Sequence, residues 1–115
     1  MKNNCKIMNK LYIIGAINEL NTDLEACAGY DIKENGTYTV LNLSYYRWIT
    51  VVTYNGKYII NSITERISIF SNGNISIFSH FNDGTVRSST VRIISDTSID
   101  VQIENASGIR VYLHN

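Results

Sequence analysis

The chain has 115 residues, a formal net charge of zero, 44% hydrophobic residues, 17% charged residues and no proline. This length supports one domain with one modest hydrophobic core. The balanced charge argues against nucleic-acid binding, because a nucleic-acid-binding domain needs a concentrated basic surface. The longest apolar run, at residues 11–14, is far too short to span a membrane, so we expect no membrane insertion.

Residues 11–29 are predicted to form a short helix preceded by a basic N-terminal arm at residues 1–10. Spacings of four, three and four residues separate the apolar positions Ile13, Ile17, Leu20 and Leu24. This spacing is typical of a coiled-coil seam, here about two heptads long, and Gly29 would end the helix. Two heptads are marginal for a stable coiled coil. The seam therefore packs either against the rest of its own chain or between chains.

Residues 30–115 are predicted to form an all-β head domain. β-Branched and aromatic residues dominate this region in short runs that are separated by turn residues. Eight strands are predicted, at residues 37–41, 46–54, 57–62, 66–70, 74–80, 89–94, 98–103 and 109–113. Short strands at regular spacing favour an antiparallel β-sandwich of jelly-roll-like type.

The side-chain pattern within these strands predicts one buried and one exposed face. Ile99, Val101 and Ile103 alternate with polar residues, whereas Phe78 interrupts the alternation that Ile75 and Ile77 begin. The strand at residues 46–54 is apolar on both faces, so it is predicted to be central or to have one face covered by another subunit. Asn-Gly at residues 55–56 predicts a tight hairpin, because both residues accept positive φ angles. Residues 72–73 and 83–84 predict two further turns.

No residue pattern indicates catalysis or a bound metal. The two histidines lie far apart in sequence, and the chain has no zinc-binding, phosphate-binding or nucleophile motif. We therefore expect a non-enzymatic protein without a cofactor or metal. Cys5 and Cys27 lack the spacing of a metal-ligand pair or a disulfide framework, and both are predicted to be free thiols.

Two groups of residues are candidates for ligand binding. The first is the aromatic cluster of Tyr45, Tyr46 and Trp48. The second is the loop that contains His80, Phe81, Asn82 and Asp83. Aromatic rings can stack on sugar rings, and loops on a rigid sandwich commonly carry recognition. The alternative is that the rings fill the core and that the loop residues serve only the backbone of a turn.

Two segments resemble bacteriophage fibre proteins. The stretch Ile-Gly-Ala-Ile-Asn-Glu-Leu-Asn at residues 14–21 resembles a segment that adjoins trimeric helical sections of phage fibres. The stretches at residues 97–99 and 108–112 resemble the last strands of small β domains that end phage tail fibres.

The resemblance implies a homotrimeric virion fibre or decoration subunit, assembled in the host cytoplasm. Residues 1–10 would attach it to a phage capsid or tail protein, and the β head would bind host-surface carbohydrate. The residues alone leave two other functions open. One is a monomeric module that binds carbohydrate or protein, and the other is a small phage inhibitor directed at a host protein.

Overall fold

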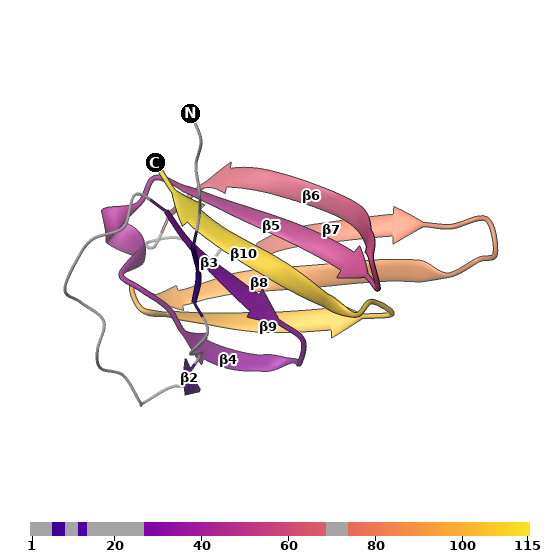
Figure 1. Ribbon diagram of the computed structural model, residues 1–115, viewed down its shortest axis with the longest axis horizontal. Helices are drawn as coiled ribbons and strands as arrows, with labels where there is room; N and C mark the ends of the chain where they lie inside the picture. The colour runs from indigo at the N-terminus through magenta and orange to yellow at the C-terminus, as the bar shows by residue number, and fades with distance from the viewer. Residues whose placement is uncertain (1–5, 9–11, 14–26, 69–73) are drawn as a thin grey trace.

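The computed structural model describes residues 6–8, 12–13, 27–68 and 74–115. They form two five-stranded β-sheets packed face to face (Figure 1). Sheet A has the order β1 (Lys6–Met8), β3 (Cys27–Ile32), β10 (Gly108–His114), β5 (Trp48–Asn55) and β6 (Tyr58–Arg66). Sheet B has the order β2 (Tyr12–Ile13), β4 (Gly36–Thr39), β9 (Ser98–Glu104), β8 (Val86–Ser95) and β7 (Asn74–His80). The predicted all-β sandwich is confirmed.

The strand order is nested. In sheet A, β3 pairs with β10, and in sheet B, β4 pairs with β9. Across the two sheets, β5 lies near β8 and β6 lies near β7. This nesting is jelly-roll-like, although the hairpins β5–β6 and β7–β8 each stay within one sheet. Every strand pair is antiparallel except β1 with β3, which is parallel.

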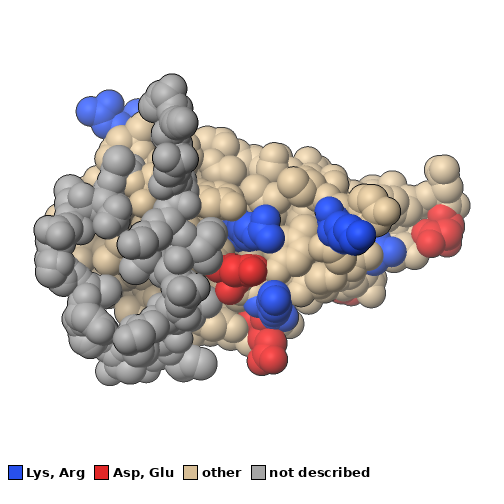
Figure 2. All heavy atoms as spheres, viewed as in Figure 1, with Lys and Arg blue, Asp and Glu red and all other residues tan. Residues whose placement is uncertain are grey.

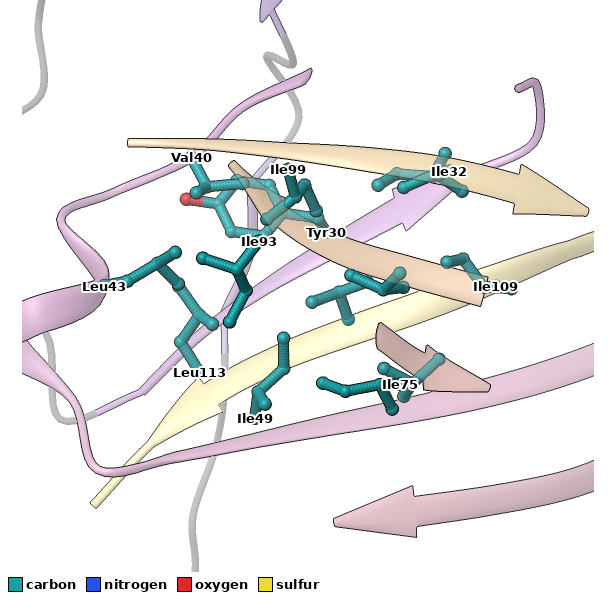
Figure 3. Close-up of a cluster of buried hydrophobic side chains, with 14 of the residues drawn as sticks. Tyr30, Ile32, Val40, Leu43, Ile49, Ile75, Ile93, Ile99, Ile109 and Leu113 are labelled. Atoms are coloured by element: carbon teal, nitrogen blue, oxygen red, sulfur yellow. The ribbon is translucent and has the colours of Figure 1, made fainter. Parts of the chain in front are cut away.

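The hydrophobic core lies between the two sheets and is built from alternate residues of their strands (Figure 3). In β5 and β10 the fully buried hydrophobic side chains are Ile49, Val51, Ile109, Val111 and Leu113. In sheet B the buried hydrophobic side chains are Ile75, Ile77, Val91, Ile93, Ile99 and Val101. A period of two places successive side chains on opposite faces of a sheet, so this one pattern fixes both the core and the outer surface.

The predicted helix at residues 11–29 is wrong wherever the structure describes it. Ile13 lies in β2, which pairs with β4, and Gly29 lies inside β3 instead of ending a helix. The other three seam residues, Ile17, Leu20 and Leu24, lie outside the described residues. The heptad spacing misled at the described ends because β3 is buried along nearly its whole length and therefore shows no strand alternation.

The other strand predictions hold with small shifts, except the one at residues 66–70. Arg66 ends β6, and the Ile67 amide then donates a hydrogen bond to the Arg47 carbonyl at 2.8 Å. Residues 69–70 and the predicted turn at residues 72–73 lie outside the described residues. The tight hairpin after Asn55 is confirmed, but its turn residues are Gly56 and Lys57. Asn55 pairs with Tyr58 as the last residue of β5, and of the Asn-Gly pair only Gly56 has a positive φ, at +62°. Strand β5 is paired on both sides, by β10 and β6, as the prediction of a central strand requires.

The prediction of free thiols is wrong for Cys27, which is disulfide-bonded. This residue begins β3 and is buried. Cys5 lies outside the described residues. The sequence spacing carried no signal of this bond, because a disulfide depends on Cα separation in space and not on distance along the chain.

Tyr54 is held on the outer face of sheet A by three neighbours. Its hydroxyl donates a hydrogen bond to Asp31 Oδ1 at 2.6 Å, and the Arg110 guanidinium carbon lies 5.0 Å from its ring centroid. A Cβ added to Gly108 would lie 2.7 Å from the Tyr54 hydroxyl oxygen, so only glycine leaves room for this ring. Burial, and then the hydrogen bond to Asp31 and its charge, raise the pKa of Tyr54 to about 12.

The elevated pKa predicts a loss of stability at alkaline pH. Burial also raises the pKa of Tyr30 to about 12, so both protonated hydroxyls stabilise the folded state below the usual tyrosine pKa of 10.0. The free energy of unfolding should fall as pH rises from about 10 to about 12, because the folded chain then holds protons that the unfolded chain has released. Urea unfolding in this window should show a shallower fall for Tyr54→Phe than for the native chain. Equal slopes would contradict the assignment to Tyr54.

Candidate functional site

The aromatic cluster predicted from the sequence does not form a single surface. Tyr46 is 4% exposed and belongs to the core, whereas Tyr45 ends η1 (Leu43–Tyr45) with 56% of its surface exposed. Trp48 is half-buried at the start of β5, where the Arg66 guanidinium carbon lies 5.6 Å from its ring centroid. Only Tyr45 and Trp48 therefore reach the surface, and Trp48 already has a cation over its ring.

The predicted loop is confirmed as the turn between β7 and β8, at the tip of a hairpin that projects beyond the rest of the sandwich (Figure 1). The Phe81 amide donates to the Thr85 carbonyl at 2.9 Å, and the Gly84 amide donates to the Phe81 carbonyl at 3.0 Å. The Thr85 amide donates to Asp83 Oδ1 at 2.9 Å, which lowers the pKa of the Asp83 carboxyl. Gly84 has φ +88°, so the glycine serves the backbone.

The side chains at this tip are exposed. His80, Asn82 and Asp83 are exposed, and Phe81 is partly covered by Arg87, whose guanidinium carbon lies 5.1 Å from its ring centroid. Arg87 also donates a hydrogen bond to the Asn105 carbonyl. The tip is thus a well-defined turn, and its predicted role in binding stays a prediction.

A pocket of about 410 Å³ lies on the outer face of sheet B. Its lining combines one aromatic ring with small and polar side chains. The lining residues are Asn35, Phe78, Ser88, Thr90, Gln102, Ile103 and Glu104. We call this pocket the sheet B groove.

The strand register explains the shape of the sheet B groove. Phe78 of β7, Ser88 of β8 and Glu104 of β9 stand opposite one another in one row. The next row places Thr90 of β8 opposite Gln102 of β9. Because β8 contributes only small side chains to these rows, it forms a low floor between the ring on one side and the longer polar side chains on the other.

Phe78 is the unusual residue of the sheet B groove. It occupies an outward position of β7 and is 60% exposed, whereas its neighbour Ile77 is 4% exposed and belongs to the core. A large exposed ring does not contribute its area to the core, and it gives the groove an apolar wall. The sequence did carry a signal of this placement. Phe78 is apolar at a position where the alternation begun by Ile75 and Ile77 calls for a polar residue facing the solvent.

Asn35 closes one end of the sheet B groove. Strand β4 pairs with β9 only as far as Val101, and beyond that point the Ile103 amide donates to Asn35 Oδ1 at 2.7 Å. The loop before β4 is thereby fixed to the edge of β9. This hydrogen bond turns the acceptor of the Asn35 amide toward the strand and leaves its Nδ2 group as a donor for a ligand.

Comparison with protein-family models, with curated proteins and with solved structures finds no match for this chain. The function of the chain must therefore be inferred from the geometry of its surface. In the residues that the structure describes, no helix is long and apolar enough to cross a membrane, and no three His, Cys, Asp or Glu side chains are grouped so that they could hold a metal ion.

Charge does not single out another docking surface in the view of Figure 2. Lys, Arg, Asp and Glu side chains are interspersed over the described part of that face, with broad uncharged areas between them. The sheet B groove remains the candidate site, because it combines a concave shape, an exposed ring and several hydrogen-bonding side chains.

The neighbouring residues Ile77 and Phe78 provide a test of this assignment. Ile77→Ala should lower the free energy of unfolding by about 2–5 kcal/mol, because it leaves a cavity in the core. Phe78→Ala should change it by about 0.5 kcal/mol or less, because this side chain is mostly in water. Urea unfolding followed by Trp48 fluorescence measures both variants. A similar large loss for Phe78→Ala would make Phe78 a folding residue and remove the reason for assigning it to a site.

Proposed function

We propose that this chain is a non-enzymatic structural subunit of a bacteriophage virion, a fibre or decoration protein whose β head binds host-surface glycans through the sheet B groove. The subunit is a homotrimer that attaches to the phage capsid or tail through its N-terminal region. The observation that carries the binding function is the exposed Phe78 ring facing Gln102 and Glu104 across a floor of small side chains.

This combination suits a sugar ring. One face of a pyranose carries mostly C–H groups, which stack on an aromatic ring, while its edge carries hydroxyls that need hydrogen-bond partners. Phe78 offers the ring face, Gln102 and Glu104 offer hydrogen-bond partners on the other side of the groove, and Thr90 offers a hydroxyl on its floor. The volume of about 410 Å³ has the size of a small-molecule site.

Three further observations support the placement on a virion. Nested double-sheet folds of this type serve both viral capsid proteins and lectins. Disulfides such as that of Cys27 persist in oxidising surroundings, which include virion surfaces. Residues 14–21 resemble the segment that adjoins helical sections of phage fibres. Because fold alone does not fix function, the proposed glycan binding rests on the groove, and the proposed virion location rests on these three observations together.

A monomeric glycan-binding module is the second candidate. It is favoured by the pairing of β1 with β3 and of β2 with β4, because both N-terminal strands extend the chain's own sheets. Ile13, the first residue of the predicted trimer seam, is part of that intramolecular pairing. The two candidates share the sheet B groove and differ in their oligomeric state.

Glycan binding should be measurable on an array of bacterial surface glycans, followed by calorimetry with the best ligand. Phe78→Ala should weaken that ligand about fivefold or more, because stacking on an aromatic ring contributes about 1 kcal/mol beyond the area buried. Tyr58→Ala is the matched control, since Tyr58 is 75% exposed on β6 and does not line the groove. Equal effects of the two substitutions would place binding elsewhere on the surface.

Light scattering on the purified chain separates the two candidates. The fibre proposal predicts a molar mass of about three times the 13.0 kDa of one chain. Introducing charge into the predicted seam with Leu20→Glu should dissociate that trimer. A mass of one chain for the native protein at micromolar concentration would overturn the trimer and favour the monomeric module.

A further inference from the structure

The geometry points to an uncharged pyranose, and not an acidic or phosphorylated sugar, as the ligand of the sheet B groove. This inference rests on the proposed glycan binding and specifies the chemical class of the sugar. The inference follows from the charge of the side chains that line the groove and from the contacts of the nearby arginines.

Among the described residues that line the groove, Glu104 is the only one with an ionised side chain, and it stands in the same row as Phe78. A carboxylate accepts hydrogen bonds from two sugar hydroxyls and donates none. A sugar that stacks on Phe78 therefore presents its edge to a negative charge. A carboxylate or phosphate on that edge would be repelled, whereas neutral hydroxyls would be bound.

The described arginines of sheet B do not line the groove. Arg87 lies on β8, but its guanidinium donates to the Asn105 carbonyl and lies over the Phe81 ring. Arg92 lies one row beyond Thr90 and stands opposite Asp100 of β9. The Asp100 carboxylate accepts a hydrogen bond from the Thr37 hydroxyl at 3.2 Å, and neither arginine is among the residues that line the groove.

The remaining polar side chains fit hydroxyl groups and not an anion. The Gln102 amide offers both donors and an acceptor, which matches the two-way hydrogen bonding of a sugar hydroxyl. The Thr90 hydroxyl, which shares a hydrogen bond with the Ser76 hydroxyl at 3.2 Å, adds a further uncharged partner. A site for a carboxylate or phosphate would instead need a fork of charged donors, as arginine provides. In the part of the chain that the structure describes, no lysine or arginine lines the groove.

Matched sugar pairs test this inference with the native chain. Galactose is compared with galacturonic acid, glucose with glucuronic acid, and glucose with glucose 6-phosphate, so that each pair differs in one charged group. An array of neutral and acidic bacterial glycans extends the comparison. We expect the neutral member of each bound pair to bind about tenfold or more tightly than its acidic partner at low salt. Raising the salt concentration to about 1 M should narrow that difference, because ions screen exposed charges.

Charge-neutral variants identify the residue responsible. Glu104→Gln should bring the affinity of the acidic sugar close to that of its neutral partner, while the neutral sugar changes by only a few-fold. Glu65→Gln removes an exposed carboxylate of β6 outside the groove and should leave the preference unchanged.

The possible results separate the inference from the function on which it rests. Tighter binding of acidic sugars that Phe78→Ala still weakens would overturn the uncharged-ligand inference and retain glycan binding in the groove. A neutral preference that Glu104→Gln leaves unchanged would also overturn it, since the charge of Glu104 would not be its cause. Absence of binding to every neutral and acidic glycan would overturn the proposed function together with the inference.

Discussion

The structure depends on the burial of one face of each sheet against the other. Alternate residues of β5, β10, β8 and β9 supply this buried layer, and a shift of one residue in any of these strands would exchange its core face for its solvent face. The same constraint determines the outer surface. Once Ile75 and Ile77 are fixed in the core, Phe78 must point outward, and the ladders to β8 and β9 place it opposite Ser88 and Glu104. The candidate site is therefore a direct consequence of the core.

Much of this fold could be predicted from local patterns. The strands with strict alternation and the hairpin after Asn55 were found because both signals come from neighbouring residues, although the turn lies at residues 56–57 and not at 55–56. Strand β3 was missed because its burial pattern has no polar face to reveal a period of two. Its role depends on pairing with β10, which lies about 80 residues away in the sequence and leaves no local trace. The disulfide of Cys27 was missed because it depends on the separation of two Cα atoms in space, which spacing along the sequence does not show.

The candidate site was harder to predict than the fold. Aromatic density identified Tyr45, Tyr46 and Trp48, but density does not say which ring points inward, and Tyr46 lies in the core. Phe78 stood alone in sequence and gained its meaning only from partners on two other strands. Asn35 likewise reaches the groove because β4 ends its pairing with β9 before Ile103. A binding surface on the face of a sheet is assembled across strands, so its members are scattered along the chain.

The nested strand order has a consequence for the rate of folding. The hairpins β5–β6, β7–β8 and β8–β9 join residues that are close in sequence, so they can form early. The pairs β3–β10 and β4–β9 close much longer loops, and the entropy of closing such loops must be lost before their hydrogen bonds form. Folds dominated by such distant pairings fold over milliseconds to seconds. During that time the edge of β5 has not yet paired with β10 and is available to other chains, as are Tyr58 and Ile59 on β6. Misassembly should therefore arise while the chain folds during synthesis, and not through unfolding of the finished head.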